Sequence, residues 1–83
     1  MLIAINFKLK EIVFIEIKFR ESSEYYSIFE SITVRQQKRI FKSAEVFLST
    51  IYPNYKDYKI RFDAYFVKND FDFEYFKDAW RDY

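Results

Sequence analysis

The stretch that decides the fold is Ile12-Val13-Phe14-Ile15-Glu16-Ile17-Lys18-Phe19-Arg20, an apolar and β-branched run whose second half carries charges at alternate positions. Because side chains alternate across a strand, the run predicts a strand with Glu16, Lys18 and Arg20 on one face. Ile12 and Phe14 share that face, and the other face holds Val13, Ile15, Ile17 and Phe19. Ionisable groups enter a buried strand when they pair, bind a metal or do chemistry. These charges are therefore candidates for a functional site, with a water-facing ion pair as the structural alternative.

Two elements adjoin this strand along the chain. Residues 2–7 form an apolar run that a short polar interruption separates from it, which predicts an antiparallel hairpin. Thr33-Val34-Arg35-Gln36 has capping-box spacing, and the apolar residues that follow it recur at helical spacing as far as Ile51. Tyr52-Pro53 should end this helix, because the residue before a proline is displaced from the helical region.

Residues 59–67 alternate between apolar and polar side chains, which predicts a third strand. Its two faces would hold Ile60, Phe62, Ala64 and Phe66 on one side and Arg61, Asp63 and Tyr65 on the other. A strand, a helix and a strand in this order predict two parallel strands joined by a right-handed crossover. Residues 27–30 suit a brief helical turn, and residues 71–83 suit a short strand followed by a helical turn. The expected fold class is α/β (α+β), a small mixed β-sheet with a hairpin and then a β-α-β unit.

Composition narrows the possible chemistry. The 83 residues make one domain over residues 1–83, and 51% hydrophobic residues with 24% aromatics supply a core. The aromatic surplus has a second interpretation as stacking platforms for unpaired bases. With no cysteine and no histidine, any metal site must use oxygen ligands, which suit Mg²⁺. The apolar start is too short for a signal peptide or a membrane span, so we expect a cytoplasmic protein with no membrane partner.

The predicted helix carries the most basic patch of the chain. Arg35, Lys38, Arg39 and Lys42 lie within about two turns, and spacings of three and four residues gather them on one side. Such a stripe supplies salt-sensitive phosphate contacts that do not depend on base sequence. The alternative is a solvated helix face opposite the core. The net charge of +1 gives the whole chain no bias towards nucleic acid.

Several short motifs occur together in this chain. They are Val13-Phe14-Ile15-Glu16-Ile17-Lys18 with Arg20, Glu30-Ser31-Ile32-Thr33 leading into Arg35, Gln37 and Arg39, then Ala44, Leu48, Arg61-Phe62-Asp63 and Ala79-Trp80. In this combination the chain resembles the YraN-type family of uncharacterised proteins. That family is similar to Holliday-junction-resolvase-like endonucleases of the PD-(D/E)xK nuclease superfamily, and the resemblance implies a restriction-endonuclease-like core.

The resemblance also implies a site. Two carboxylates and a backbone carbonyl would hold Mg²⁺ or Mn²⁺, while a lysine orients water for attack on a phosphodiester. Glu16 and Lys18 are the expected catalytic residues, with Glu16 as the metal ligand. Contacts to DNA, branched or structured, would come from Arg20, Arg35, Gln37, Lys38, Arg39 and Lys42. Gln37 would reach the site or simply belong to the capping region.

Two departures from the family pattern limit these expectations. The family's first helix is missing, and the aspartate of its Gly-Glu-Ile-Asp motif, the second metal carboxylate, falls on Met1. A glycine of the family's loop is Tyr26 here. We therefore expect an N-terminally truncated member whose cation is weakly bound or absent. Asp63 would stand in for the lost acid or serve as a structural hydrogen-bonding group.

The expected function is a nucleic-acid-acting domain that resembles a metal-dependent DNA endonuclease and is catalytically impaired. The alternatives are a non-catalytic nucleic-acid- or protein-binding module and a decayed gene fragment. Without the first helix, the sheet face that holds Ile12 and Phe14 should be exposed and should self-associate or bind a partner. Part of its cover would come from Phe73, Phe76 and Trp80.

Overall fold

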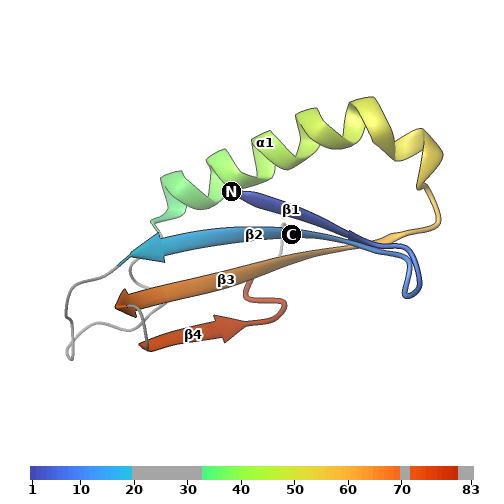
Figure 1. Ribbon diagram of the computed structural model, residues 1–83. Helices are drawn as coiled ribbons and strands as arrows, with labels where there is room; N and C mark the ends of the chain where they lie inside the picture. The colour runs from blue at the N-terminus through green and yellow to red at the C-terminus, as the bar shows by residue number, and fades with distance from the viewer. Residues whose placement is uncertain (20–32, 70–71, 81–83) are drawn as a thin grey trace.

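The computed structural model describes residues 1–19, 33–69 and 72–80. Its elements are β1 (Leu2–Asn6), β2 (Glu11–Phe19), α1 (Val34–Ile51), the short 3₁₀ turn η2 (Tyr52–Asn54), β3 (Lys59–Asn69) and β4 (Asp72–Phe76). The strands form one sheet in the order β1-β2-β3-β4 (Figure 1). The outer pairs are antiparallel, and the central pair, β2 with β3, is parallel. The predicted fold class, a mixed sheet with a hairpin and then a β-α-β unit, is confirmed.

Local chemistry explains the hairpin and the helix. The side-chain oxygen of Asn6 accepts the N–H groups of Lys8 and Leu9 at 3.1 and 2.9 Å, and Lys10 adopts a left-handed φ of 54° in a chain without glycine. The Thr33 hydroxyl oxygen accepts the Gln36 N–H, and the Gln36 side chain accepts the Thr33 N–H, so the predicted capping box is present.

Three boundaries differ from the predictions or lie outside the described ranges. β3 continues to Asn69, two residues beyond the predicted end, because the β3–β4 pairing extends it. After β4 the described residues form a turn and no helix, and Asp78 adopts a positive φ of 53°. The predicted helical turn at residues 27–30, together with Arg20 and Tyr26, lies outside the described residues.

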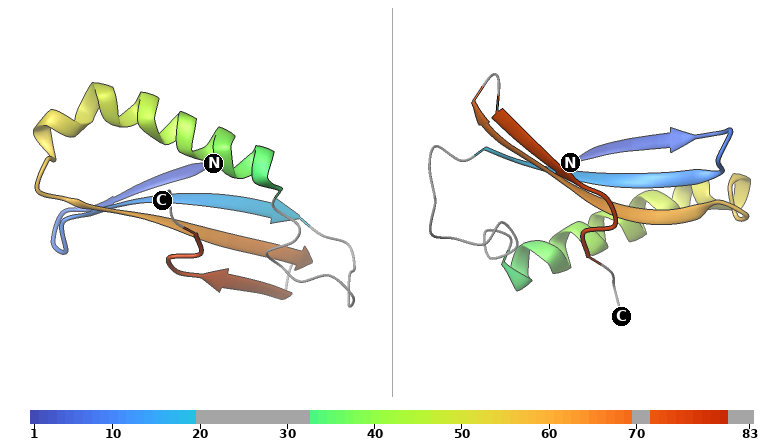
Figure 2. Two further views of the ribbon diagram at one scale, coloured as in Figure 1. Left: turned by 180° about the vertical axis from the view of Figure 1, so that it is seen from behind. Right: turned by 90° about the horizontal axis from the view of Figure 1, so that it is seen from below.

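The helix covers only one face of the sheet (Figure 2). Ile12 and Phe14 are fully buried there with Ala44 of α1, and Ile40 joins Ala64 and Phe66 in an adjacent cluster. The prediction that the Ile12 and Phe14 face is exposed is therefore wrong. The crossover helix packs on that face, to which β3 directs its apolar row and β2 directs Ile12 and Phe14.

The opposite face, which we call the open face, carries most of the exposed large apolar side chains of the strands. These are Leu2, Ile17, Phe19, Phe73 and Tyr75. Phe76 and Trp80 pack against the helix-covered core as predicted, whereas Phe73 is 57% exposed. No helix in the described part of the chain is long and apolar enough to cross a membrane.

Candidate nucleic-acid interface

The carboxyl end of β2 and the first half of α1 meet at a small pocket. Glu16 is half-buried on the helix-covered face, where its register partner on β3 is Ala64. A pocket of about 200 Å³ is lined by Glu16 together with Met1, Arg39, Ile40 and Ser43. The structure thus brings together two predicted site residues, Glu16 from the strand and Arg39 from the helix.

Met1 also enters this pocket, which places the residue at the family's aspartate position beside Glu16. Leu2 pairs with Ile15, so the chain at Met1 approaches β2 next to Glu16. An acid at that position would share the pocket with the Glu16 carboxylate. The two positions that the sequence paired by resemblance therefore lie together, although one of them carries a thioether.

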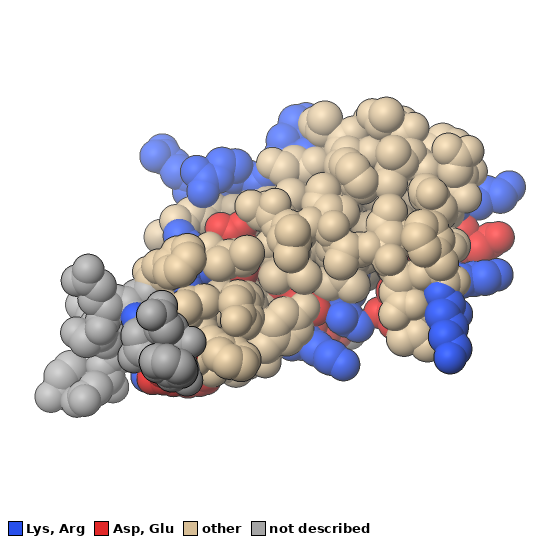
Figure 3. Space-filling model, in the orientation of Figure 1, with Lys and Arg blue, Asp and Glu red and all other residues tan. Residues whose placement is uncertain are grey.

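The basic stripe of α1 consists of Arg35, Lys38, Arg39 and Lys42, and all four side chains are exposed. Lys and Arg side chains gather over this half of α1 in Figure 3. The first turn of the helix contains no acid, so the positive end of the helix dipole adds to the same potential. Within residues 1–19, 33–69 and 72–80, none of the four forms an ion pair.

Three further predicted site residues are Lys18, Gln37 and Arg20. Lys18 is half-buried on the same sheet face as Glu16, and the ion pair that the sequence left as an alternative does not form between them in the described part of the chain. Gln37 is half-buried at the start of α1, where its N–H donates to the Thr33 carbonyl at 2.9 Å. Arg20 lies outside the described ranges.

A cation site is not assembled by these residues. Among the residues that the structure describes, no three side chains of Asp, Glu, His or Cys gather in a way that would hold a metal ion. Among the described residues that line its pocket, Glu16 is the one carboxylate. Mg²⁺ on a single carboxylate keeps most of its water and is held weakly. The described residues therefore do not fit the Mg²⁺ or Mn²⁺ that the family resemblance implies.

Asp63 does not complete that site, because it points to the other side of the sheet. Its register partner is Ile15, one residue before Glu16, and neighbouring residues of a strand face opposite ways. Its side chain is completely buried. It accepts Arg61 Nε at 2.8 Å, Arg61 Nη2 at 3.0 Å, the Asp78 N–H at 2.9 Å and the Tyr75 hydroxyl.

This network accounts for the charge state of its members. Burial alone would raise the pKa of Asp63, but the donors from Arg61, Tyr75 and Asp78 hold that pKa below its usual value. Burial of the phenol and its hydrogen bond to Asp63 raise the pKa of Tyr75 to about 12. Asp63 therefore has the structural role that the sequence left as an alternative. Sequence reasoning missed Tyr75 and Asp78, since only the β3–β4 pairing brings them to Asp63.

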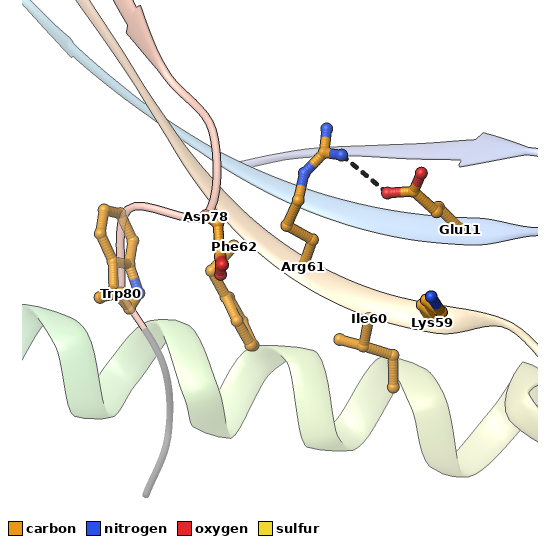
Figure 4. A pocket seen from close by; sticks show the side chains of 7 residues that line it. All are labelled: Glu11, Lys59, Ile60, Arg61, Phe62, Asp78 and Trp80. Carbon is orange, nitrogen blue, oxygen red and sulfur yellow. Dashed lines mark hydrogen bonds and ion pairs between the residues drawn. The ribbon is translucent and has the colours of Figure 1, made fainter. Parts of the chain in front are cut away.

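The Asp63 network borders a larger pocket that shares no residue with the Glu16 pocket. About 580 Å³ in volume, it is lined by Glu11, Lys59, Ile60, Arg61, Phe62, Asp78 and Trp80. In Figure 4, Ile60 and Phe62 point towards α1, while Arg61 points away and pairs with Glu11 at 2.7 Å. Arg61 and Glu11 thus already link β3 to β2, and the Asp78 N–H links the segment after β4 to Asp63.

Comparisons with known proteins agree with the family resemblance. The model of the uncharacterised protein family UPF0102 matches residues 2–67, which include β1, β2, α1 and most of β3. A UPF0102 protein of Acinetobacter baumannii (strain AYE) is 41% identical over 54 residues, 65% of this chain and 40% of that protein. A relative from Fusobacterium nucleatum is 39% identical over 57 residues, 69% of this chain and 46% of that protein.

A third relative extends the similarity. The UPF0102 protein of Francisella tularensis subsp. novicida is 32% identical over 68 residues, 82% of this chain and 56% of that protein. The chain therefore spans between about two-fifths and just over half of the length of these relatives. Glu16, Lys18 and the basic stripe all lie within the matched residues 2–67, whereas Ala79-Trp80 lies beyond them.

Proposed function

The chain belongs to the uncharacterised protein family UPF0102, and from this premise we propose that it is a nucleic-acid-binding domain that contacts phosphates through the first half of α1. The resemblance of the family to structure-directed endonucleases suggests branched DNA as the ligand. The proposal concerns this chain and the residues that it carries.

One observation carries the proposal. Arg39 belongs both to the exposed basic stripe and to the pocket of Glu16, so a phosphate bound by the stripe would lie next to the polar end of β2. Four cations without an ion-pair partner in the described ranges keep their full charge for a polyanion.

We further propose that this chain binds without efficient cleavage. A metal-dependent phosphodiesterase needs its cation close to the scissile phosphate and to the attacking water, which one carboxylate does not secure. Glu16 would then act as a repulsive neighbour of the phosphate and Lys18 as a further cation beside it. Both catalysis and tight metal binding by Glu16 would need further ligands, which the described residues do not supply.

The binding proposal is tested by fluorescence anisotropy with labelled four-way-junction, duplex and single-stranded DNA. If the stripe makes three to four phosphate contacts, the logarithm of affinity should fall with the logarithm of salt with a slope of about −3. The variant R35Q/K38Q/R39Q should lose most of the affinity and most of the slope.

A matched control removes the same charge elsewhere. Lys8, Lys56 and Lys59 are exposed outside α1, so K8Q/K56Q/K59Q changes the net charge equally and leaves the stripe intact. We expect this control to bind nearly as well as the natural chain. An equal loss of affinity in both triple variants would show that net charge alone causes the effect. No loss of affinity in either variant would show that α1 does not contact the DNA.

Cleavage is followed on the same DNA over time with Mg²⁺ or Mn²⁺. No product above the no-metal background is expected from the natural chain. Robust cleavage that Glu16→Ala abolishes would contradict the proposal of an impaired site while leaving the binding proposal standing.

A further inference from the structure

Trp80 joins the segment after β4 to the half of α1 that carries the basic stripe. Its side chain packs against the cluster of Ile40, Ala64 and Phe66, to which α1 contributes Ile40. Figure 4 shows the Trp80 ring beside the ribbon of α1. Two parts of the chain that lie far apart in the sequence therefore meet at the first half of the helix.

We propose that Trp80 is a positioning residue for the basic stripe. It fixes the first half of α1 on the sheet and so sets the position of Arg39 relative to Glu16. The inference rests on the proposed function, because the stripe is there the surface that binds DNA. Trp80 acts through Ile40 and does not contact the DNA itself.

The first half of α1 has few other attachments to the sheet. Ile40 and Ala44 are the buried residues of the helix, and Ala44 belongs to the other core cluster, which holds the second half. All residues of α1 before Ile40 are exposed or half-buried, and Val34 is 66% exposed. The ring of Phe41 meets that of Phe62 edge-on, with 4.8 Å between their centroids. The place of the helix start therefore depends on Ile40 and Phe41.

The position of Trp80 is itself fixed from β3. The Asp78 N–H donates to the carboxylate of Asp63 at 2.9 Å, and the Ala79 N–H donates to the carbonyl of Phe62 at 2.7 Å. These two hydrogen bonds hold the backbone directly before Trp80 against the strand. The indole ring thus transmits the position of β3 to the Ile40 cluster.

Ile40 connects this cluster to the candidate site. It is 4% exposed, and it also lines the pocket of Glu16 and Arg39. Arg39 is its neighbour on α1, whereas Glu16 is held in the centre of the sheet by β2. A displacement of Ile40 would therefore move Arg39 relative to Glu16.

Packing, and not hydrogen bonding, is the contribution of the ring. The indole N–H of Trp80 is buried and donates to no acceptor among the residues that the structure describes. A buried donor without an acceptor is unfavourable, so this N–H does not explain why the ring lies there. Phenylalanine supplies a ring without the N–H. It should therefore replace Trp80 in this role, whereas alanine should not.

Hydrogen–deuterium exchange of the α1 amides and anisotropy with four-way-junction DNA test the proposal on the full chain. Trp80→Ala should lower the protection of the amides of residues 38–41 by about tenfold or more relative to those of residues 47–51. The salt slope of DNA binding should fall in magnitude by about 1, as for the loss of one phosphate contact. Trp80→Phe should keep both the protection and the slope.

Leu48→Ala is the matched control. Leu48 is half-buried and packs against the cluster of Ile12, Phe14 and Ala44, so this variant removes apolar contacts under the second half of α1. It should lower the overall stability but leave the salt slope unchanged while the chain is folded. If circular dichroism shows that Trp80→Ala does not fold, Trp80→Leu, which keeps part of the side-chain volume, takes its place.

Three results would overturn the proposal. One is a folded Trp80→Ala variant whose amide protection and salt slope match those of the natural chain. Another is an equal loss of slope in Leu48→Ala, because overall stability would then explain the effect. The third is a Trp80→Phe variant as impaired as Trp80→Ala, because packing would then not be the cause.

Failure of the proposed function would look different. A natural chain that binds no DNA would contradict that function, and the exchange measurement alone would then decide whether Trp80 holds the start of α1.

Discussion

Glu16 and Asp63 lie one register step apart on neighbouring strands, yet they occupy opposite layers of the molecule. Asp63 is completely buried on the open side and accepts hydrogen bonds from Arg61, Tyr75 and Asp78. Glu16 is half-buried under α1, and the part of the chain that the structure describes supplies it with no ion pair. A carboxylate whose acceptors are all used holds the fold together, whereas one with unused acceptors remains available to a ligand.

The largest expected effect separates the two acids by stability. Asp63→Ala leaves the charge of Arg61 partly uncompensated and removes the acceptor of the Asp78 N–H. The free energy of unfolding should therefore fall by about 3 kcal/mol. Glu16→Ala should change it by less than about 0.5 kcal/mol, as is usual for a side chain without specific partners. Urea unfolding followed by circular dichroism measures both. Similar losses of stability in the two variants would contradict the different roles assigned to Asp63 and Glu16.

The loss of stability at acidic pH should depend on Asp63. Because its pKa is lower in the folded than in the unfolded chain, its contribution is complete above the unfolded value and is lost as pH falls through the folded value. The natural chain should therefore lose stability below about pH 4, the ordinary range of an aspartate. Urea unfolding at several pH values should show the difference between natural chain and Asp63→Asn shrinking there. A difference that stays constant with pH would contradict an ionised Asp63.

Tyr75 sharpens the same contrast at alkaline pH. Its pKa of about 12 in the folded chain exceeds the ordinary value of 10.0, so its contribution is complete below about pH 10 and is lost as pH rises towards 12. Tyr75→Phe should cost about 1.5 kcal/mol at neutral pH, since the hydrogen bond is to a charged acceptor. In urea unfolding, the free energy of unfolding of this variant should also fall less steeply above about pH 10 than that of the natural chain. Tyr65→Phe, on the same face, is the control. Equal behaviour of both variants would remove Tyr75 from the network.

Local patterns in the sequence predict most of the fold and only part of the site. The capping box at Thr33, the helix end at Tyr52-Pro53 and the alternation of β2 and β3 depend on neighbouring residues, and all are confirmed. Alternation separates Glu16 from Asp63 by face, but it does not reveal which face the crossover helix covers. For that reason the exposed face was assigned wrongly.

Non-local pairing accounts for what the sequence did not predict. Tyr75 and Asp78 reach Asp63 only through the register of β3 with β4, which no local pattern of residues 72–80 specifies. Arg39 and Glu16 were both candidates, but their shared pocket depends on how α1 crosses β2. The partners of Asp63 and of Glu16 therefore depend on tertiary packing and not on local sequence.

The smallest expected effect concerns the pocket that Met1 shares with Glu16. Met1→Asp, produced behind a cleavable tag, places a second carboxylate beside Glu16 and should tighten Mn²⁺ binding by about tenfold, or about 1.4 kcal/mol. Leu2→Asp is the matched control, because it adds the same charge one residue away on the open face, opposite Ile15. Electron paramagnetic resonance of Mn²⁺ reports free and bound metal directly. The gain should disappear in Met1→Asp/Glu16→Ala, and an equal gain from Leu2→Asp would show that charge alone, and not the shared pocket, attracts the cation.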